Sequence, residues 1–278
     1  MSSSIELTGV RQVFNVRDKS GRPQEFVALD GLDLTIRAGE LFVLVGPSGC
    51  GKSTVLDLIS GLNTPAAGSI TVGGRVVEQP GLDRGFVFQQ YTLLPWRTAQ
   101  GNIEFALEAA GGLRRAERRE RAREYLELVG LTEFADRYPH ELSGGMKQRV
   151  AIARSLSYEP DVLLMDEPYG ALDAQTRERL QQELLSIWRR TGTTVVFITH
   201  DIDEAVFLGQ RVGVMSSRPG RLKAVVDIDL NHDDPNQDLR STEEFARYRH
   251  QVWSLLRSDF QPTAVRETAP AGEVERVA

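Results

Sequence analysis

Several residue types and patterns that mark other classes of protein are scarce in this chain of 278 residues. Its only cysteine is Cys50, which excludes an internal disulfide and a zinc site built from several thiolates. The longest purely apolar runs, such as Leu41–Val45 and Val195–Ile198, are about five residues long, whereas a helix that crosses a membrane needs roughly 20. We therefore do not expect the chain to cross a membrane itself.

An excess of positive charge is also absent. The 33 Lys and Arg residues oppose 39 Asp and Glu residues, which gives a net charge of −6 and disfavours a general attraction to nucleic acid. Arginines do gather in the segment Arg114–Arg123, but Glu117, Glu120 and Glu124 alternate with them at spacings that stabilise a solvated helix. We therefore expect no nucleic-acid partner, and an anion-binding patch on this helix is the alternative.

Apolar segments and helical patterns alternate along most of the chain. Residues 5–10 and 32–36 alternate apolar and polar side chains, as half-buried strands do. Continuous apolar runs predict buried strands of a parallel sheet at Leu41–Val45, Gly85–Phe88, Val162–Met165, Thr194–Ile198 and Val212–Met215. Strands separated by helices indicate the α/β class.

Three other stretches differ from this pattern. Asn15–Glu25 is rich in charge, Gly and Pro, which predicts an exposed hairpin or loop. Thr98–Tyr158 contains no convincing strand, which predicts an all-helical insertion. Near the C-terminus, residues 241–260 have apolar side chains at helical spacing, with Ser241 and Glu244 placed as a capping box.

The two ends of the chain carry little to bury. Met1–Thr8 has neither the basic region nor the apolar core of a secretory signal, so we expect the protein to stay in the cytoplasm. Residues 262–278 are rich in Pro, Gly, Glu and Arg, and we expect a mobile tail there.

The most specific motif, G-x-x-x-x-G-K-S, directly follows the predicted strand 41–45 and precedes an apolar helical segment. Its residues are Gly46, Pro47, Ser48, Gly49, Cys50, Gly51, Lys52, Ser53 and Thr54. The glycines let backbone N–H groups converge on a phosphate chain, Lys52 adds a positive charge, and the Ser53 hydroxyl can bind Mg²⁺. The alternative is a Gly-rich turn with a surface lysine, which the flanking strand and helix disfavour.

Two adjacent carboxylates end another apolar strand. Asp166 and Glu167 follow Val162–Met165, at the end of a strand where ligands bind in open α/β sheets. Because side chains alternate along a strand, Asp166 can hold Mg²⁺ while Glu167 polarises an attacking water as a general base. Alone, such a pair is more often a solvated strand end, but together with a phosphate-binding loop it indicates a site.

A third motif opens a helix. Ser143, Gly144 and Gly145 precede the apolar-periodic segment 150–154, and such a helix start presents N–H groups and a positive dipole end to an anion. Taken by itself, this segment is better explained as a serine that caps a structural helix.

These motifs together resemble a known family. Gly46–Thr54, Leu142–Gln148, Val162–Pro168 and His200, in this order, resemble the nucleotide-binding subunit of ABC transporters, over about residues 5–230. The resemblance implies a RecA-like P-loop core formed by residues 5–92 and 156–230, an N-terminal antiparallel β subdomain and an inserted helical subdomain, 93–155. Residues 231–278 would hold a C-terminal helix and the tail.

The resemblance also implies an ATPase that acts as a pair of subunits, expected to be two copies of this chain. Each ATP, with Mg²⁺, would lie between the P-loop of one subunit and the Ser143–Gly145 helix start of the other. Asp173 matches a loop that crosses the dimer. Gln89 matches a glutamine that approaches Mg²⁺ and the attacking water, and His200 matches a histidine that contacts the γ-phosphate. Without the resemblance, His200 is more often a structural residue.

The base-stacking aromatic of this family corresponds to Phe14, with Phe26 as a competitor. Tyr91–Thr98 and Met215–Arg221 resemble the branch that imports nitrate, sulfonates and taurine. The protein would then work at the cytoplasmic face of the membrane with a separate transmembrane permease and, indirectly, an extracytoplasmic solute-binding protein. The exposed segment around Trp96 would meet the permease, or else Trp96 packs in the helical subdomain. The alternatives are an exporter, a lipid-handling system, or a soluble ABC ATPase outside transport.

Overall fold

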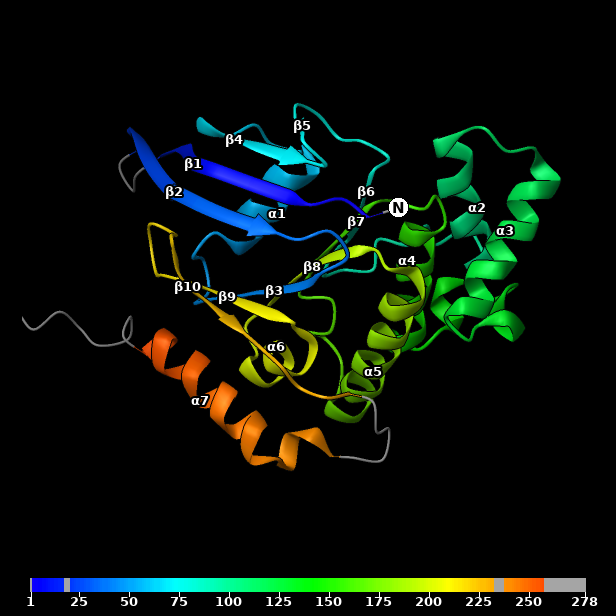
Figure 1. Cartoon of the computed structure of the whole chain (residues 1–278). Helices are drawn as coiled ribbons and strands as arrows, with labels where there is room; N and C mark the ends of the chain where they lie inside the picture. Colours follow the sequence, from blue (N-terminus) through cyan, green and yellow to red (C-terminus); the bar gives the residue numbers. More distant parts are fainter. Residues whose placement is uncertain (1, 18–20, 233–237, 258–278) are drawn as a thin grey trace, which may run out of the picture.

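The computed structural model describes residues 2–17, 21–232 and 238–257. Within them lie a six-stranded sheet of order β10-β9-β3-β8-β7-β6 and a four-stranded sheet of order β2-β1-β4-β5 (Figure 1). The strands are β1 Ile5–Arg17, β2 Pro23–Ile36, β3 Leu41–Val45, β4 Ala67–Val72, β5 Arg75–Val76, β6 Arg84–Val87, β7 Val162–Asp166, β8 Thr194–Thr199, β9 Arg211–Met215 and β10 Leu222–Asp227.

Some of the described helices lie against the larger sheet, and others form a separate group beside it (Figure 1). Their bounds are α1 Lys52–Ser60, α2 Ala99–Ala110, α3 Arg115–Leu128, α4 Gly144–Leu156, α5 Ala174–Thr191, α6 Ile202–Leu208 and α7 Glu243–Arg257, with short 3-10 turns at Thr132–Phe134, Pro139–Glu141 and Leu239–Ser241.

The six-stranded sheet is the central layer. Strands β3, β6, β7, β8 and β9 run parallel, and β10 pairs antiparallel with β9. Alternate residues of β3 enter two different cores: Leu41 and Val43 pack with α4 to α7, while Phe42 and Leu44 pack with α1 and the small sheet. Burial on both faces explains why β3 is apolar at every position.

The strands expected from the continuous apolar runs are all present, with ends that differ by at most one residue. The sequence did not predict β4, β5 or β10, which are short or only half buried. The expected α/β class and the P-loop core with its antiparallel β subdomain and helical subdomain are confirmed.

The four-stranded sheet forms the antiparallel subdomain. Its β1 and β2 pair from Ile5 opposite Ile36 to Arg17 opposite Pro23. The exposed stretch 15–25 is therefore a hairpin, as expected, although residues 18–20 lie outside the described part. The apolar side chains of the four-stranded sheet share one core with α1 and with Phe42 and Leu44 of the larger sheet.

Helices α2, α3 and α4 lie between β6 and β7 in the chain and form the helical part at the right of Figure 1. No strand is described between Thr98 and Tyr158, as expected. Asn102, on α2, is fully buried. Its side-chain amide accepts from the Leu94 N–H at 2.7 Å and donates to the carbonyls of Leu94, Arg97 and Thr98 at 3.2, 3.1 and 2.9 Å, which fixes the loop before α2. The subdomain limits 93–155, 5–92 and 156–230 stay a prediction.

The C-terminal helix α7 is docked, as expected. Phe245, Val252 and Leu256 bury its apolar face against the core beside α6. The predicted capping box is wrong: Thr242 caps the helix, its Oγ1 accepting from the Phe245 N–H at 3.2 Å. Ser241 ends a 3-10 turn and donates to the Asp238 carbonyl at 2.8 Å instead, so it is one residue too early. The expected tail at 262–278 lies outside the described residues.

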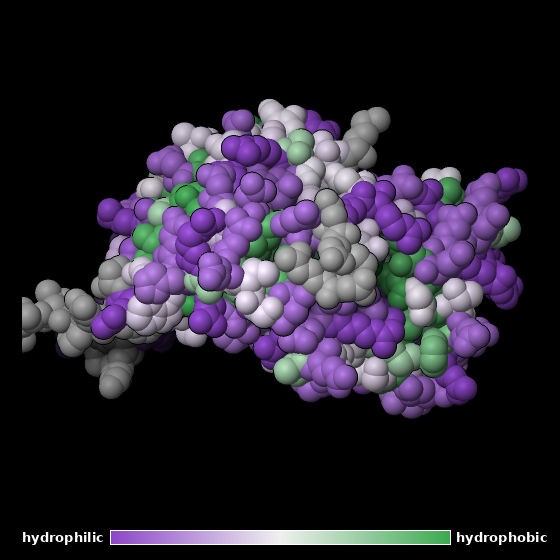
Figure 2. Space-filling view, turned by 60° about the horizontal axis from the view of Figure 1, so that its bottom comes forward, coloured by the Kyte–Doolittle hydropathy of each residue, from purple (hydrophilic) through white to green (hydrophobic). Residues whose placement is uncertain are grey.

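The surface of the molecule is mostly hydrophilic in the view of Figure 2, where hydrophobic residues form a few separate groups. Among the described helices, none combines the length and the apolar character that crossing a membrane requires.

Candidate nucleotide site

The residues singled out in the sequence gather at one edge of the large sheet. Because β3, β6, β7 and β8 are parallel and adjacent in pairs, their carboxyl ends meet at the same edge. The loop 46–51 follows β3, Gln89 follows β6, Asp166 and Glu167 end β7, and His200 follows β8.

The phosphate-binding loop has little room for side chains. Gly49 and Gly51 have φ of 73° and 99°, a region that glycine adopts without steric cost. A Cβ at Gly46 would lie 2.6 Å from the sulfur of Cys50, and one at Gly51 would lie 2.7 Å from a methyl group of Leu29. Cys50 is itself buried, so it fills the interior of the loop rather than facing a ligand.

The first turn of α1 is available to an anion. Its N-cap is Gly51, which has no side chain that could cap the first N–H groups of the helix. A helix start leaves N–H groups without intrahelical partners and carries a partial positive charge. Lys52 is 6% exposed, and its Nζ donates to the carbonyls of Gly46 at 2.9 Å and Pro47 at 3.3 Å. The ammonium thus lies across the loop, and loop and ammonium together fit a phosphate chain.

Two oxygen groups beside the loop fit a magnesium ion. The Ser53 hydroxyl donates to Asp166 Oδ1 at 3.2 Å. Burial raises the pKa of Asp166, and the neighbouring Glu167 raises it further, while the bond from Ser53 lowers it. A carboxylate whose charge is poorly solvated gains most from a nearby cation, and hydroxyl and carboxylate oxygens are the ligands that Mg²⁺ prefers.

Glu167 adopts an unusual backbone conformation. Its φ is 42°, a left-handed value that costs an ordinary residue about 1–3 kcal/mol and occurs often at functional sites. Its N–H donates to the Ile198 carbonyl of β8 at 3.0 Å. Its Oε2 lies 3.0 Å from Nδ1 of His200, which follows β8. The turn therefore brings a carboxylate and an imidazole from adjacent strands together.

Gln89 reaches the same place from the other side. Gln89 Nε2 and Glu167 Oε2 both lie close to Gly170: they are 3.8 Å and 4.0 Å from the position that a Cβ on Gly170 would take. Beside Glu167, Gly170 and His200 lies a hollow of about 20 Å³, which is enough for one water molecule.

The Ser143–Gly145 helix start does not join this group within one chain. Ser143 caps α4 by accepting from the Met146 N–H at 3.3 Å. A Cβ on Gly144 would touch Leu172 and the hydroxyl of Tyr91. Among the described residues, no hydrogen bond or ion pair connects 143–145 with the loop 46–54.

Asp173 is likewise engaged elsewhere within the chain. It caps α5, accepting from the Thr176 N–H at 2.9 Å, and these hydrogen bonds lower its pKa. Its proposed place in a dimer contact is therefore not visible in a single copy.

The two candidate base-stacking aromatics are neighbours. Phe14 of β1 and Phe26 of β2 stand directly opposite each other, so their rings lie on the same face of the small sheet. The Arg218 guanidinium covers the ring of Phe26, with its Cζ 5.4 Å from the ring centre, and its Nε donates to the Gly49 carbonyl at 3.1 Å. In the sequence, Met215–Arg221 resembles the branch that imports nitrate, sulfonates and taurine, but no role was predicted for Arg218.

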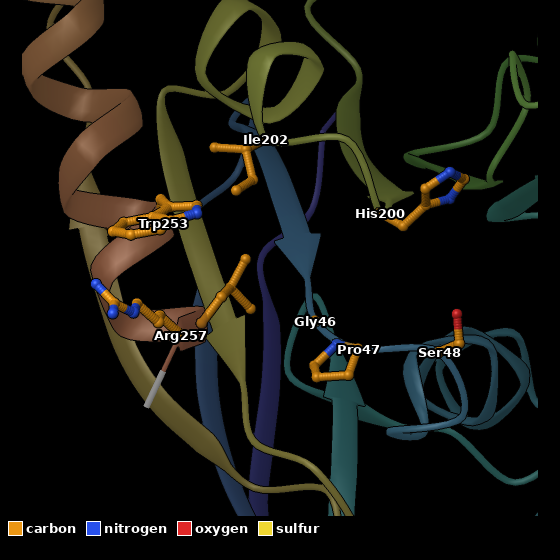
Figure 3. A pocket seen from close by; sticks show the side chains of 8 residues that line it. Gly46, Pro47, Ser48, His200, Ile202, Trp253 and Arg257 are labelled. Atoms are coloured by element: carbon orange, nitrogen blue, oxygen red, sulfur yellow. The ribbon is translucent and has the colours of Figure 1, made fainter. Parts of the chain in front are cut away.

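The C-terminal helix also borders the site, which the sequence did not predict. A cavity of about 460 Å³ lies between the loop residues Gly46 to Ser48, His200 and α7. In Figure 3, Trp253 and Arg257 of α7 lie on one side of this cavity, and His200 and Ser48 lie on the other. Helix α7, which lies far along the chain from the phosphate loop, is thus part of the surroundings of that loop.

Comparisons with known proteins agree with this geometry. The sequence model of the family described as ABC transporter matches residues 29–170. The chain is 48% identical over 258 residues to the nitrate import ATP-binding protein NrtD of Synechocystis sp., covering 91% of this chain and 95% of that one. It is 49% identical over 235 residues to the taurine import ATP-binding protein TauB of Rhizobium johnstonii, covering 83% and 89%.

A solved structure is similar as well. The ATP-binding cassette MJ0796, in a dimeric post-hydrolysis state bound to ADP and Pi, superposes with a TM-score of 0.69 at 34% identity, over 82% of this chain and 100% of that one. The resemblance drawn from the sequence motifs is confirmed: the chain belongs to the ABC transporter family of ATP-binding proteins.

Proposed function

We propose that this chain is the ATP-hydrolysing subunit of an ABC importer and that it works as a homodimer beneath a separate permease. The observation that carries the proposal is the convergence, at one sheet edge, of a phosphate loop with a buried lysine and of the Glu167–His200 pair. The phosphate loop can bind a nucleotide, and the Glu167–His200 pair can act on the water that attacks its γ-phosphate.

The phosphate chain is held by the protein backbone and by Lys52. On binding, the anion would take over the donors at the start of α1, and the Lys52 ammonium would exchange its two carbonyl partners for phosphate oxygens. Ser53, Asp166 and Gln89 are the residues that would hold Mg²⁺, which would supply positive charge to the phosphate oxygens. These contacts bind and orient the nucleotide before the chemical step.

Hydrolysis depends on where a proton can go. Glu167 accepts a proton from the attacking water as its oxygen approaches the γ-phosphorus, and His200 fixes the carboxylate from the neighbouring strand. Gln89 stands within reach of the same space and orients the water. As the water attacks, the bond from the γ-phosphorus to the bridging oxygen would break, and ADP would leave with that oxygen.

A second copy completes the site. Because no hydrogen bond or ion pair of the described residues ties the Ser143–Gly145 helix start to its own phosphate loop, this helix start can meet the γ-phosphate bound in the partner. The dimeric state of the similar cassette MJ0796 supports this arrangement. ATP would then join the two copies, and hydrolysis would separate them.

The permease would dock on the loop that carries Trp96. This side chain is 71% exposed, so the alternative that it packs in the subdomain core is wrong. Asn102 holds the loop rigidly, and the nearby Phe105 ring, 42% exposed, carries the Arg97 guanidinium 5.0 Å above it. An exposed aromatic on a fixed loop is typical of a protein contact. This contact would hold the subunit at the cytoplasmic face of the membrane.

The solute class follows from the relatives. NrtD is named for nitrate import and TauB for taurine import, and this chain covers nearly the whole of each. We therefore assign import of a small anion of the nitrate, sulfonate or taurine type, delivered to the permease by an extracytoplasmic binding protein. Export, lipid handling and a role outside transport are the competing functions.

Co-purification tests the proposal. A tag on this chain in native membranes should retain a multi-span permease and a solute-binding protein, identified by mass spectrometry. Trp96→Ala should lose the permease while the purified chain keeps its ATPase activity. Trp253→Ala, an exposed tryptophan on α7, is the matched control and should keep the permease. Recovery of ribosomes, or of no membrane protein, would contradict a role in transport.

A further inference from the structure

The turn Met215–Arg221, between β9 and β10, is built to hold one position. The Ser216 N–H donates to the Arg221 carbonyl at 2.9 Å, the Ser216 hydroxyl donates to the Pro219 carbonyl at 3.1 Å, and the Arg221 N–H donates to that hydroxyl oxygen at 3.0 Å. Three such bonds within seven residues make the turn a fixed support for whatever side chain it carries.

The turn is also fastened to the nucleotide site. Gly220 donates to the Ala28 carbonyl at 2.9 Å and accepts from the Asp30 N–H at 3.1 Å, so it pairs with β2. A Cβ on Gly220 would collide with the carbonyl oxygen of Cys50, inside the phosphate loop. The turn, β2 and the phosphate loop therefore lie in direct backbone contact.

Arg218 joins these three elements through one planar group. Its Nε donates to the Gly49 carbonyl at 3.1 Å, and its Cζ is 3.3 Å from where a Gly49 Cβ would stand. The same guanidinium lies over the ring of Phe26. The guanidinium therefore contacts both the phosphate loop and Phe26. The cross-strand neighbour of Phe26 is Phe14.

This contact distinguishes the two aromatics. One face of Phe26 is occupied by Arg218, whereas among the described residues no ring or cation is stacked on Phe14. An adenine ring needs a free aromatic face, which favours Phe14 over Phe26 as the adenine platform. Phe26, held by Arg218, keeps the hairpin end at a fixed distance from the phosphate loop, and that distance must match the span from base to phosphates.

We propose that Arg218 is a positioning residue of the nucleotide site: by tying Phe26 to the phosphate loop, it sets where the adenine platform at Phe14 stands. The inference rests on the proposed function, because it takes ATP as the substrate. It adds a determinant of nucleotide affinity from outside the ATPase motifs. Lysine cannot replace it fully, since only a planar guanidinium can cover the ring and bond to the carbonyl at once.

The test compares a nucleotide with its phosphates alone. In the full chain, Arg218→Ala should weaken MgADP binding about tenfold by calorimetry, while binding of magnesium pyrophosphate changes less than twofold. The KM for ATP should rise with kcat nearly unchanged. Arg221→Ala is the control: it removes an equal charge from the same turn, where the exposed pair with Asp30 contributes little, and it should leave MgADP affinity within twofold.

Two further variants identify the platform. Phe26→Ala should weaken MgADP as much as Arg218→Ala, and the double variant should be no weaker than either single one, because both remove the same support. Phe14→Ala should weaken MgADP at least as much and leave pyrophosphate unchanged. The proposal is overturned if Arg218→Ala has no effect on MgADP, or if pyrophosphate affinity falls in parallel. If the wild-type chain binds no MgADP, the proposed function itself fails.

Discussion

Replacing Glu167 with glutamine separates nucleotide binding from hydrolysis. The substitution keeps the shape of a side chain whose backbone has φ of 42° and whose Oε2 lies 3.0 Å from His200 Nδ1. It removes the negative charge that accepts the proton of the attacking water. Lys52 and Ser53 are unchanged, so the phosphate contacts remain. Glu167→Gln should therefore bind ATP with unchanged affinity.

The expected loss of hydrolysis rate follows from the role of the Glu167 carboxylate as a general base. Loss of a general base typically costs 10²–10⁴-fold in rate, which corresponds to about 3–5 kcal/mol of barrier height. Since hydrolysis is what separates the two copies, a slow variant should accumulate as an ATP-bound dimer. The effect on turnover is thus expected together with a change in oligomeric state.

The assay combines phosphate release with light scattering during size-exclusion chromatography. Glu167→Gln with MgATP should elute as a dimer and release phosphate at least about 100-fold more slowly than wild type. The double variant with Lys52→Ala should return to the monomer, because the dimer depends on bound ATP. A monomeric Glu167→Gln variant with wild-type turnover would refute the assignment of Glu167 and the link between ATP and dimerisation.

Other substitutions test the rest of the site. Lys52→Ala should weaken ATP binding about 10- to 100-fold by calorimetry, because one charge-assisted contact is lost; unchanged affinity would contradict the phosphate-loop assignment. Burial raises the pKa of Asp166 above its ordinary 3.8, so the folded chain holds this proton more tightly than the unfolded chain does. The stability contributed by the protonated form is then lost as pH rises through the raised pKa. Asp166→Asn cannot ionise and should resist urea better than wild type at pH 7, with the difference shrinking toward pH 4, while Mg²⁺-dependent turnover is lost; equal urea midpoints at both pH values would count against this account. Asn102→Ala should lower the free energy of unfolding by about 1–3 kcal/mol, because the carbonyls of Arg97 and Thr98 lose the donor that a fully buried amide supplies; a urea midpoint equal to that of wild type would show that the loop does not depend on this amide.

Much of the site was predictable because it is local in the sequence. The loop 46–54 needs small residues, a lysine and a hydroxyl at fixed spacing between a strand and a helix, and all of these are adjacent in the chain. The apolar run Val162–Met165 predicts a buried strand whatever its neighbours are, so the placement of Asp166 and Glu167 at its end followed directly. The α/β class followed from the order of such runs.

The contacts between elements depended on the tertiary structure. The Ser241 cap was mispredicted because Glu244 stands three residues after Ser241, the spacing of a capping box, whereas Thr242 has Phe245 at that position. The 3-10 turn that ends at Ser241 makes Thr242 the cap instead. The exposure of Trp96 depends on how the Asn102 amide folds the loop before α2, a set of bonds with no periodic signal in the sequence.

Sequence by itself determined which residues can bind phosphate and which carboxylates stand at a strand end, because those properties depend on neighbours along the chain. Tertiary structure alone decided that Glu167 meets His200, that Arg218 lies between Phe26 and Gly49, and that α7 borders the phosphate loop. Each of these contacts joins segments 33 or more residues apart. Their geometry is set by strand order and packing, which no short pattern in the chain records.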